Sequence, residues 1–379
     1  MSLAVANPPA DRPMAAGLVP ALGALVIGEC LVDLAPEPPT GPDRHGAQQG
    51  RVETEALRFV AFPGGSPANV AVGLARLGVP SYFGGRLSRV AFGPVLREHL
   101  ARNAVDLRHA VDAAEPPTLA VVTLDDRGRA SYVFYGPESA DWQWSLEQLP
   151  FENGARAGPA PAELGLAVVH TGSLLTVFEP AATVIPSWLR RVRQRGDVVT
   201  SFDPNVRVTL VSDADAYRAR VENLVSSSHI VKASSEDMAG IYRPGPGTLA
   251  DGEALKSSFV ERTAEHWLGL GAHLVVVTAG EEGAAAFHSR GWRAQEHPPA
   301  IEVKDTIGAG DAVTSTLLAY LYARSLLAPD AVADLGEEDM REALHQGVAA
   351  SAFTCTRWGA DPPRSVELAQ YLAALTGQR

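Results

Sequence analysis

Hydrophobic residues form short β-branched runs that alternate with longer segments of helical periodicity, from about Gly23 onward. The runs Ala167–His170 and Leu274–Thr278 are apolar almost throughout, as is typical of strands buried on both faces. The alternation predicts a doubly wound α/β fold, in which helices flank both faces of a mostly parallel sheet. The expected strands are Ala24–Gly28, Val79–Phe83, Ala167–His170, Val198–Phe202, His229–Lys232 and Leu274–Thr278. The expected helices are Pro67–Leu77, Gly93–Arg102, Pro180–Arg195, Ala214–Leu224, Glu253–Leu268, Ala312–Ser325 and Glu338–Phe353.

Two segments interrupt this alternation and predict a smaller sheet. The stretch Pro36–Phe62 begins polar and proline-rich and ends in an alternating, strand-like pattern. Leu119–Leu124 and Ala130–Tyr135 flank a short turn and predict an antiparallel hairpin. We therefore expect one domain over residues 23–379 with a small β-sheet lid near 36–62 and 112–136, preceded by a disordered leader over residues 1–22. An exposed lid edge favours pairing with a second lid, so a homodimer is one expectation.

Charge and cysteine content narrow the classes of partner and compartment. The chain has 32 basic and 44 acidic residues and a net charge of −12, so we expect neither nucleic acid nor a membrane as a partner. Cys30 and Cys355 lie far apart without His or Cys at ligand spacing, which favours a reducing cytoplasm over a disulfide framework or a zinc site. A secretion signal near Asp11 and Arg12 is the alternative, although Pro20 interrupts its apolar stretch.

A glycine-rich segment that leads directly into a helix is the strongest chemical signal. Asp305–Asp311 reads Asp-Thr-Ile-Gly-Ala-Gly-Asp and precedes the expected helix Ala312–Ser325. The glycines allow the N–H groups of Gly308–Gly310 to converge, and the helix N-terminus adds its positive end. Such amides form an anion hole for a phosphate during transfer, and Asp311 at its mouth can take the proton of an attacking hydroxyl. An ordinary acidic residue in a first helical turn is the alternative.

A second glycine segment opens another short helix. Ser66 is the expected N-cap of this helix, and Gly78 follows its C-terminus. Gly64 and Gly65 allow a ligand to approach the backbone, and Asn69 offers both a donor and an acceptor to a sugar hydroxyl. A polar first-turn residue without a ligand is the alternative for Asn69.

In their order along the chain, these motifs resemble the two signature regions of the ribokinase/PfkB family of carbohydrate kinases, over roughly residues 23–370. Gly28–Asp33 resembles the first-strand segment of the family, and Phe202–Arg207 resembles a motif of its fructokinase-like branch. The stretch from Val276 to Gly283 is similar to the segment that lines the nucleotide phosphates. Thr356–Ala360 is similar to the segment beside the adenine pocket and the monovalent-cation loop. The Walker, protein-kinase and Rossmann phosphate motifs are absent from the sequence.

The resemblance implies a ribokinase-like fold with a lid over the sugar, and a role for each matched residue. The implied catalytic groups are the base Asp311 and the anion-hole amides of Gly308, Ala309 and Gly310. The implied sugar-binding residues are Asp33, Gly64, Gly65 and Asn69, with Arg207 added as a residue that either binds a ligand or lies on the surface. The implied nucleotide-binding residues are Thr278, Gly280, Gly283 and Lys232.

ATP is expected to bind together with Mg²⁺, and the resemblance adds a monovalent cation, K⁺, as a further expectation. Family members often carry Asn-x-x-Glu where this chain has Ser234–Asp237. Asp237 is the aligned carboxylate and Glu236 its neighbour, and either of them is expected to hold hydrated magnesium. The chain also departs from the family pattern over Ser88–Ala91, where relatives usually place acidic residues.

The expected substrate is a small neutral sugar. Gly28–Leu34 and Gly64–Asn69, which are expected to line the sugar pocket, contain no Lys or Arg. Asp33 and Asn69 suit uncharged hydroxyls, and Asp33 would repel a carboxylate. We therefore expect ATP-dependent phosphorylation of fructose. Ribose, a nucleoside and 2-keto-3-deoxygluconate are the alternative substrates, and a non-catalytic sugar- or nucleotide-sensing protein is the alternative class.

Overall fold

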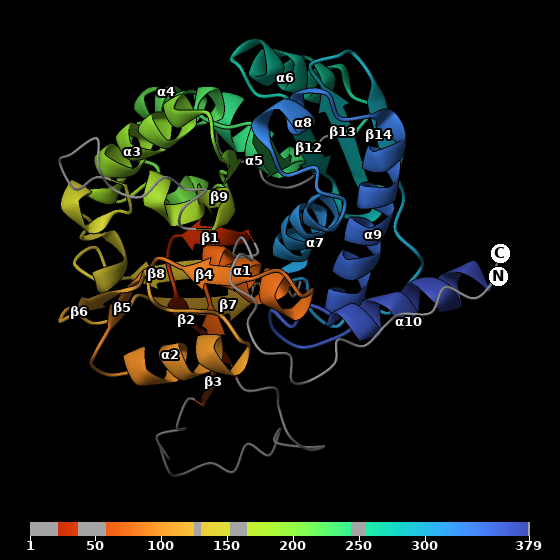
Figure 1. The fold of residues 1–379 in the computed structure, drawn as a ribbon. Helices are drawn as coiled ribbons and strands as arrows, with labels where there is room; N and C mark the ends of the chain where they lie inside the picture. Colours follow the sequence, from red (N-terminus) through yellow and green to blue (C-terminus); the bar gives the residue numbers. More distant parts are fainter. Residues whose placement is uncertain (1–21, 37–57, 125–129, 152–164, 244–254, 378–379) are drawn as a thin grey trace, which may run out of the picture.

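The computed structural model describes residues 22–36, 58–124, 130–151, 165–243 and 255–377. The strands of its central sheet are β1 Gly23–Ile27, β4 Ser81–Phe83, β9 Leu166–Gly172, β10 Val199–Asp203, β11 Ile230–Ser234, β12 Leu274–Thr278, β13 Ala284–His288 and β14 Arg293–Glu296. They lie in the order β14-β13-β12-β11-β10-β9-β1-β4 (Figure 1). The strands from β12 to β4 are parallel to one another, and β13 and β14 continue the sheet as antiparallel strands. The predicted mostly parallel sheet is confirmed.

Helices cover both faces of this sheet and bury alternate side chains of its strands. The helices are α1 Ser66–Arg76, α2 Gly93–Arg102, α3 Ala181–Arg195, α4 Ala214–Ser226, α5 Ser235–Tyr242, α6 Ser258–Gly269, α7 Ala309–Ala323, α8 Pro329–Ala333, α9 Glu337–Cys355 and α10 Ser365–Thr376. In β1, Leu25 and Ile27 enter the core formed with α3, α4 and α6. Ala24 and Val26 enter the second core, formed with α1, α7 and α9. Strand side chains alternate between faces, so a run that is apolar throughout fills two cores at once.

A second sheet of four strands forms the smaller part of the fold. Its strands are β2 Leu31–Pro36, β3 Phe59–Gly64, β7 Leu119–Leu124 and β8 Ala130–Tyr135, in the order β3-β2-β7-β8. The antiparallel pair β7 and β8 has the bounds of the predicted hairpin. Register places Phe62, Asp33, Ala120 and Phe134 in one row across the sheet, so these residues share a face. β5 Arg86–Ser88 and β6 Val111–Ala113 form a separate parallel pair.

Some predictions fall outside the described residues or need correction. The expected leader lies almost wholly outside the described residues, as does the lid segment between residues 36 and 58. The helix expected from Glu253 begins instead at Ser258, because the hydroxyl of Ser257 accepts the Val260 N–H at 3.3 Å and caps the helix. The sequence did not predict β13 and β14, and β13 opens with three alanines, which have low β-propensity.

Two observations bear on the compartment and the membrane. Cys30 and Cys355 are both buried, free thiols. Within the described part of the chain, every helix is too short or too polar to cross a membrane. The cytoplasmic location stays a prediction.

Candidate active site

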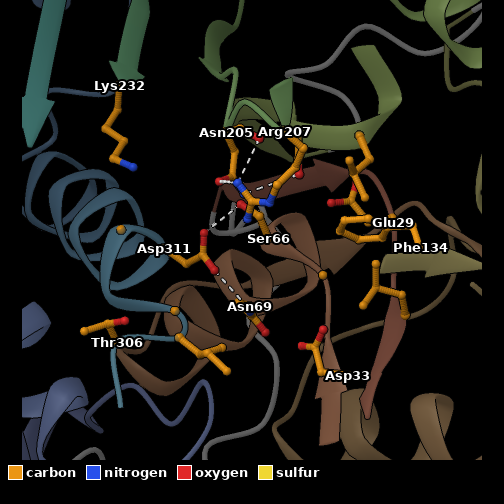
Figure 2. Close-up of a pocket in the computed structure, with 17 residues that line it drawn as sticks. Glu29, Asp33, Ser66, Asn69, Phe134, Asn205, Arg207, Lys232, Thr306 and Asp311 are labelled. Carbon is orange, nitrogen blue, oxygen red and sulfur yellow. Dashed lines mark hydrogen bonds between the residues drawn. The ribbon is translucent and has the colours of Figure 1, made fainter. Parts of the chain in front are cut away.

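A pocket lies where the carboxyl ends of the parallel strands meet the smaller sheet and the N-terminus of α7. Ligands of open α/β sheets bind at this edge, because loops and helix N-termini converge there. Figure 2 shows the pocket with side chains from both sheets and from α1 and α7. It is lined by Glu29, Leu31, Asp33, Gly65, Ser66, Asn69, Phe134, Ser173, Leu174, Asn205, Arg207, Lys232, Thr306, Ile307, Gly308, Gly310 and Asp311.

Asp311 is held by two side chains of α1 (Figure 2). The Ser66 hydroxyl donates to Oδ1 at 2.6 Å, and the Asn69 amide donates to Oδ2 at 2.8 Å. The expected N-cap role of Ser66 is therefore wrong: Gly65 is the N-cap of α1, and no side chain caps it. Burial raises the pKa of Asp311 above its ordinary value, although these two hydrogen bonds and the Lys232 ammonium oppose the shift. A carboxylate with a raised pKa accepts a proton more readily, as a general base must.

The N-terminus of α7 places backbone amides next to Asp311. Gly308 is the N-cap, with a left-handed φ of 76° that favours glycine. The Ala309 N–H donates to the Thr306 carbonyl at 3.2 Å, so the turn already engages this amide. The first N–H of α7 to bond within the helix is that of Ala312, which donates to the Gly308 carbonyl at 2.9 Å. The amides of Gly310 and Asp311 precede it, and such first-turn N–H groups are available to an anion.

Lys232 brings a buried positive charge to the same place. Its Nζ lies 3.0 Å from Oδ2 of Asp203, and both side chains are buried. A Cβ at position 310 would lie 2.7 Å from this Nζ, so glycine at 310 lets the ammonium approach the start of α7. Burial lowers the pKa of Lys232, but the carboxylates of Asp203, Asp237 and Asp311 raise it by more, so the net shift is upward. The ammonium therefore stays charged at neutral pH.

Asp33, on β2, faces the pocket from the smaller sheet. Burial raises its pKa to about 7, while Arg207 opposes the shift and the charges of Asp311 and Asp305 add to it. A Cβ at position 64 would overlap the Asp33 carboxylate. Gly64 thus makes room for a side chain of the site, whereas the sequence had suggested room for a ligand.

Arg207 lines the pocket, and its role as a ligand-binding residue stays a prediction. Its Nη1 donates to the Asn205 side-chain carbonyl at 2.8 Å. Asn205 in turn donates through its backbone N–H to Asp203 at 3.1 Å and through its amide to the Ser173 hydroxyl at 3.3 Å. The loop after β10 is therefore held to Ser173, which follows β9.

Glu29 is a buried acid in the pocket to which the sequence analysis assigned no role. Only 1% of its surface is exposed. Burial raises its pKa to about 8; the Ser173 side chain and Arg207 oppose this shift, and Asp141 adds to it. Among the described residues, its Oε2 atom has no hydrogen-bond partner.

Apart from Lys232, the predicted nucleotide and metal residues lie outside the pocket lining. Thr278 ends β12, and Gly280 and Gly283 follow it around a 3-10 helix over Gly280–Glu282. Asp237, in the first turn of α5, accepts the Val206 N–H at 2.6 Å and the Ser234 N–H at 2.7 Å. Glu236 is half-buried and lies 3.5 Å from the Ser235 hydroxyl. Across the described residues, no group of three or more His, Cys, Asp or Glu side chains is placed to hold a metal ion.

Eight of the predicted residues line the pocket: Asp33, Gly65, Asn69, Arg207, Lys232, Gly308, Gly310 and Asp311. Others that line it lay within the motifs but had no predicted binding or catalytic role: Glu29, Leu31, Ser66, Asn205, Thr306 and Ile307. Ser173, Leu174 and Phe134 carry no motif, and only the packing of β9 and β8 against the site brings them there.

The fold, the buried carboxylate and the helix N-terminus together define a kinase of the ribokinase-like class. The model of the pfkB family of carbohydrate kinases matches residues 23–367. The chain belongs to this family, and its activity is ATP-dependent phosphorylation of a sugar, as the sequence predicted. The non-catalytic alternative is thereby set aside.

Individual relatives extend this result. The chain is 33% identical over 317 residues to a fructokinase of Klebsiella pneumoniae, and this alignment covers 83% of this chain and 88% of that protein. It is 30% identical over 319 residues to a fructokinase of Rhizobium leguminosarum bv. trifolii, and this alignment covers 84% of this chain and 85% of that protein. The crystal structure of a Vibrio cholerae O395 fructokinase with fructose, ADP and calcium ion is 26% identical, covers 93% of this chain and 98% of that chain, and has a TM-score of 0.69. A Xylella fastidiosa fructokinase with bound ATP shares the fold at 24% identity with a TM-score of 0.75, covering 95% of this chain and 100% of that chain.

Proposed function

We propose that the protein is a fructokinase that transfers the γ-phosphate of ATP to a hydroxyl of fructose, with Asp311 as general base. The observation that carries this proposal is the position of Asp311, which is buried, held by Ser66 and Asn69, and placed in the first turn of α7. A base at a helix N-terminus can take a proton while the adjacent amides stabilise the phosphate that is being attacked.

In the proposed reaction, the attacking hydroxyl gives its proton to the Asp311 carboxylate and forms a bond to the γ-phosphorus. The bond from that phosphorus to the bridging oxygen breaks, and ADP leaves with the electron pair. Amides of the Gly308–Gly310 segment face the equatorial oxygens, with the Gly310 amide as the main donor because the Ala309 N–H is engaged by Thr306. The Lys232 ammonium adds positive charge on the same side.

The nucleotide is proposed to extend from the anion hole toward Thr278, Gly280 and Gly283. Magnesium enters with ATP and would neutralise phosphate charge. Glu236 suits a hydrated magnesium better than Asp237, because both Asp237 oxygens already accept backbone N–H groups. We place the monovalent-cation site at the loop over Thr356–Ala360, which is tied to the anion-hole segment by the Gly359 N–H donating to Asp305 at 2.8 Å.

The substrate assignment rests on the polar groups of the pocket and on the relatives. Asp33, Asn69 and Asn205 offer acceptors and donors that match the hydroxyls of an uncharged sugar. Arg207 also lines the pocket, but its Nη1 already donates to the side-chain carbonyl of Asn205. This bond leaves the guanidinium less suited to binding a substrate carboxylate. The relatives named above are fructokinases.

An ADP-release assay at saturating MgATP tests the proposal. We expect kcat/KM to be higher for fructose than for ribose, adenosine or 2-keto-3-deoxygluconate. A higher value for ribose or adenosine would contradict the assignment of fructose. A higher value for the keto-deoxy acid would also contradict the argument from charge.

We further propose that the protein forms a homodimer through the outer face of its smaller sheet. Phe59, Val133 and Tyr135 share this face by register, and they are 44%, 48% and 60% exposed. Exposed apolar side chains gathered on one sheet face favour association with a complementary surface. The Val133→Glu and Tyr135→Glu double variant is expected to sediment as a monomer and the unchanged protein as a dimer, with the exposed Val366→Glu on α10 as the control. A monomeric unchanged protein would refute the dimer.

A further inference from the structure

Glu29 is a buried acid of the pocket lining that the reaction above does not use. Its side chain lines the pocket, and Oε2 has no hydrogen-bond partner among the described residues. A buried polar atom left unpaired costs free energy, so native proteins rarely keep one without a reason. Because Glu29 borders the pocket, a bound ligand is a source of the missing partner.

The surroundings of Glu29 favour its neutral form. The charged groups near it are Asp141, from the 3-10 helix Ala140–Trp142, and Arg207, from the loop after β10. Ser173 is its uncharged polar neighbour, and the thiol of Cys30 adjoins it along the chain. Burial outweighs the opposing effects of Ser173 and Arg207, and the pKa of about 8 leaves the carboxyl group mostly protonated at pH 7. A protonated carboxyl group has one O–H to donate.

Glu29 lies away from the reacting end of the pocket. Asp311 is bonded to Ser66 and Asn69, whereas Glu29 interacts with Ser173 and Arg207, and Figure 2 shows Glu29 and Asp311 well separated. We take the hydroxyl on C6 as the attacking group, so a bound fructofuranose extends its anomeric carbon away from Asp311. That carbon carries both a hydroxyl and a hydroxymethyl group, and this combination distinguishes a ketohexose from an aldofuranose.

We propose that Glu29 is a specificity-determining residue that forms a hydrogen bond, as a neutral carboxylic acid, with the anomeric end of the sugar. This inference rests on the proposed function and deepens it. A site that hydrogen-bonds a substrate hydroxyl discriminates strongly against analogues that lack it, because the protein group is then left unpaired.

Two variants and three substrates test this role. Glu29→Gln keeps the size of the side chain and the ability to donate and accept, whereas Glu29→Met keeps similar length without hydrogen-bonding oxygens. The substrates are fructose, 2,5-anhydromannitol, which lacks the anomeric hydroxyl, and D-arabinose, which lacks the hydroxymethyl group. We expect Glu29→Met to lower kcat/KM for fructose by roughly 5- to 100-fold. For at least one of the two analogues, the same variant should change kcat/KM by less than about twofold, because the bond is already lost there.

The conservative variant Glu29→Gln distinguishes a role of Glu29 as a hydrogen-bond donor from a role that requires its negative charge. Glu29→Gln should keep kcat/KM for fructose within about threefold of the unchanged protein at pH 7, because an amide replaces a neutral acid as donor. The acid loses its proton as pH rises through about 8, so KM for fructose should rise between pH 7 and pH 9 in the unchanged protein. This rise should be smaller in Glu29→Gln.

Thr316→Val is the matched control, because Thr316 also has a buried, unpartnered side-chain oxygen among the described residues but lies outside the pocket lining. It should leave the ratios between the three substrates unchanged. Three results would each overturn the inference about Glu29 while leaving the proposed function intact. They are an equal loss of kcat/KM on all three substrates in Glu29→Met, no loss of kcat/KM on fructose in Glu29→Met, and a Glu29→Gln variant as impaired as Glu29→Met. Absence of fructose turnover by the unchanged protein would overturn the proposed function and the inference with it.

Discussion

Asp311→Asn is expected to lower kcat by roughly two to four orders of magnitude, which is the usual contribution of a positioned general base. The amide is nearly isosteric with the carboxylate, so the fold and the binding of ATP should persist. The base must be an acceptor with proton affinity, and an amide has almost none. Single-turnover kinetics with fructose and MgATP, together with calorimetric titration of nucleotide, measure the two quantities separately.

The surface substitution Asp334→Asn, at a carboxylate whose side chain is 83% exposed, controls for a general effect of charge. It should leave kcat unchanged. Ser66→Ala and Asn69→Ala should lower kcat less than Asp311→Asn does, because each removes one hydrogen bond to the base and leaves the carboxylate in place. An Asp311→Asn protein that keeps more than about a third of the original kcat would remove Asp311 from the mechanism.

Lys232→Met is expected to lower the free energy of unfolding by about 3–5 kcal/mol, because it leaves the buried Asp203 carboxylate without its ion-pair partner. The carboxylates of Asp237 and Asp311 also lose a neighbouring positive charge. Burial already raises the pKa of Asp237 and of Asp311, so without the ammonium these two acids are harder to ionise in the folded protein than in the unfolded chain. The variant should therefore lose more stability as pH rises from 5 to 8, because ionisation of these buried acids is then forced on the folded state.

Urea denaturation at several pH values measures this effect. The double variant Lys232→Met with Asp203→Leu should recover much of the lost stability, because it replaces both members of the buried pair by apolar groups. Lys256→Met, at an exposed lysine, should change the free energy of unfolding by less than about 0.5 kcal/mol. If Lys232→Met were as stable as the Lys256 control, the ion pair would contribute nothing to the fold.

Sequence patterns determined the features of this protein that depend on neighbouring residues. The alternation of apolar runs predicted the parallel strands, because a strand buried on both faces must be apolar at successive positions. The glycines before Asp311 predicted a helix start beside this residue, because a left-handed N-cap and first-turn N–H groups are local properties. The helix α7 begins at Ala309, before the predicted start at Ala312. The hairpin of β7 and β8 was likewise visible from its turn.

Tertiary structure decided which of these groups meet and in what protonation state. Ser66 and Asn69 lie 245 and 242 residues from Asp311 along the chain, and only the packing of α1 against α7 brings them to its carboxylate. Local sequence suggested a helix cap for Ser66, because capping is the common role of a serine at a helix start. The burial of Glu29 depends on the packing of segments distant in sequence, so no local pattern signals its unpaired oxygen or its raised pKa. Periodicity is thus encoded between near neighbours, whereas hydrogen-bond partners and desolvation arise only when distant segments pack together.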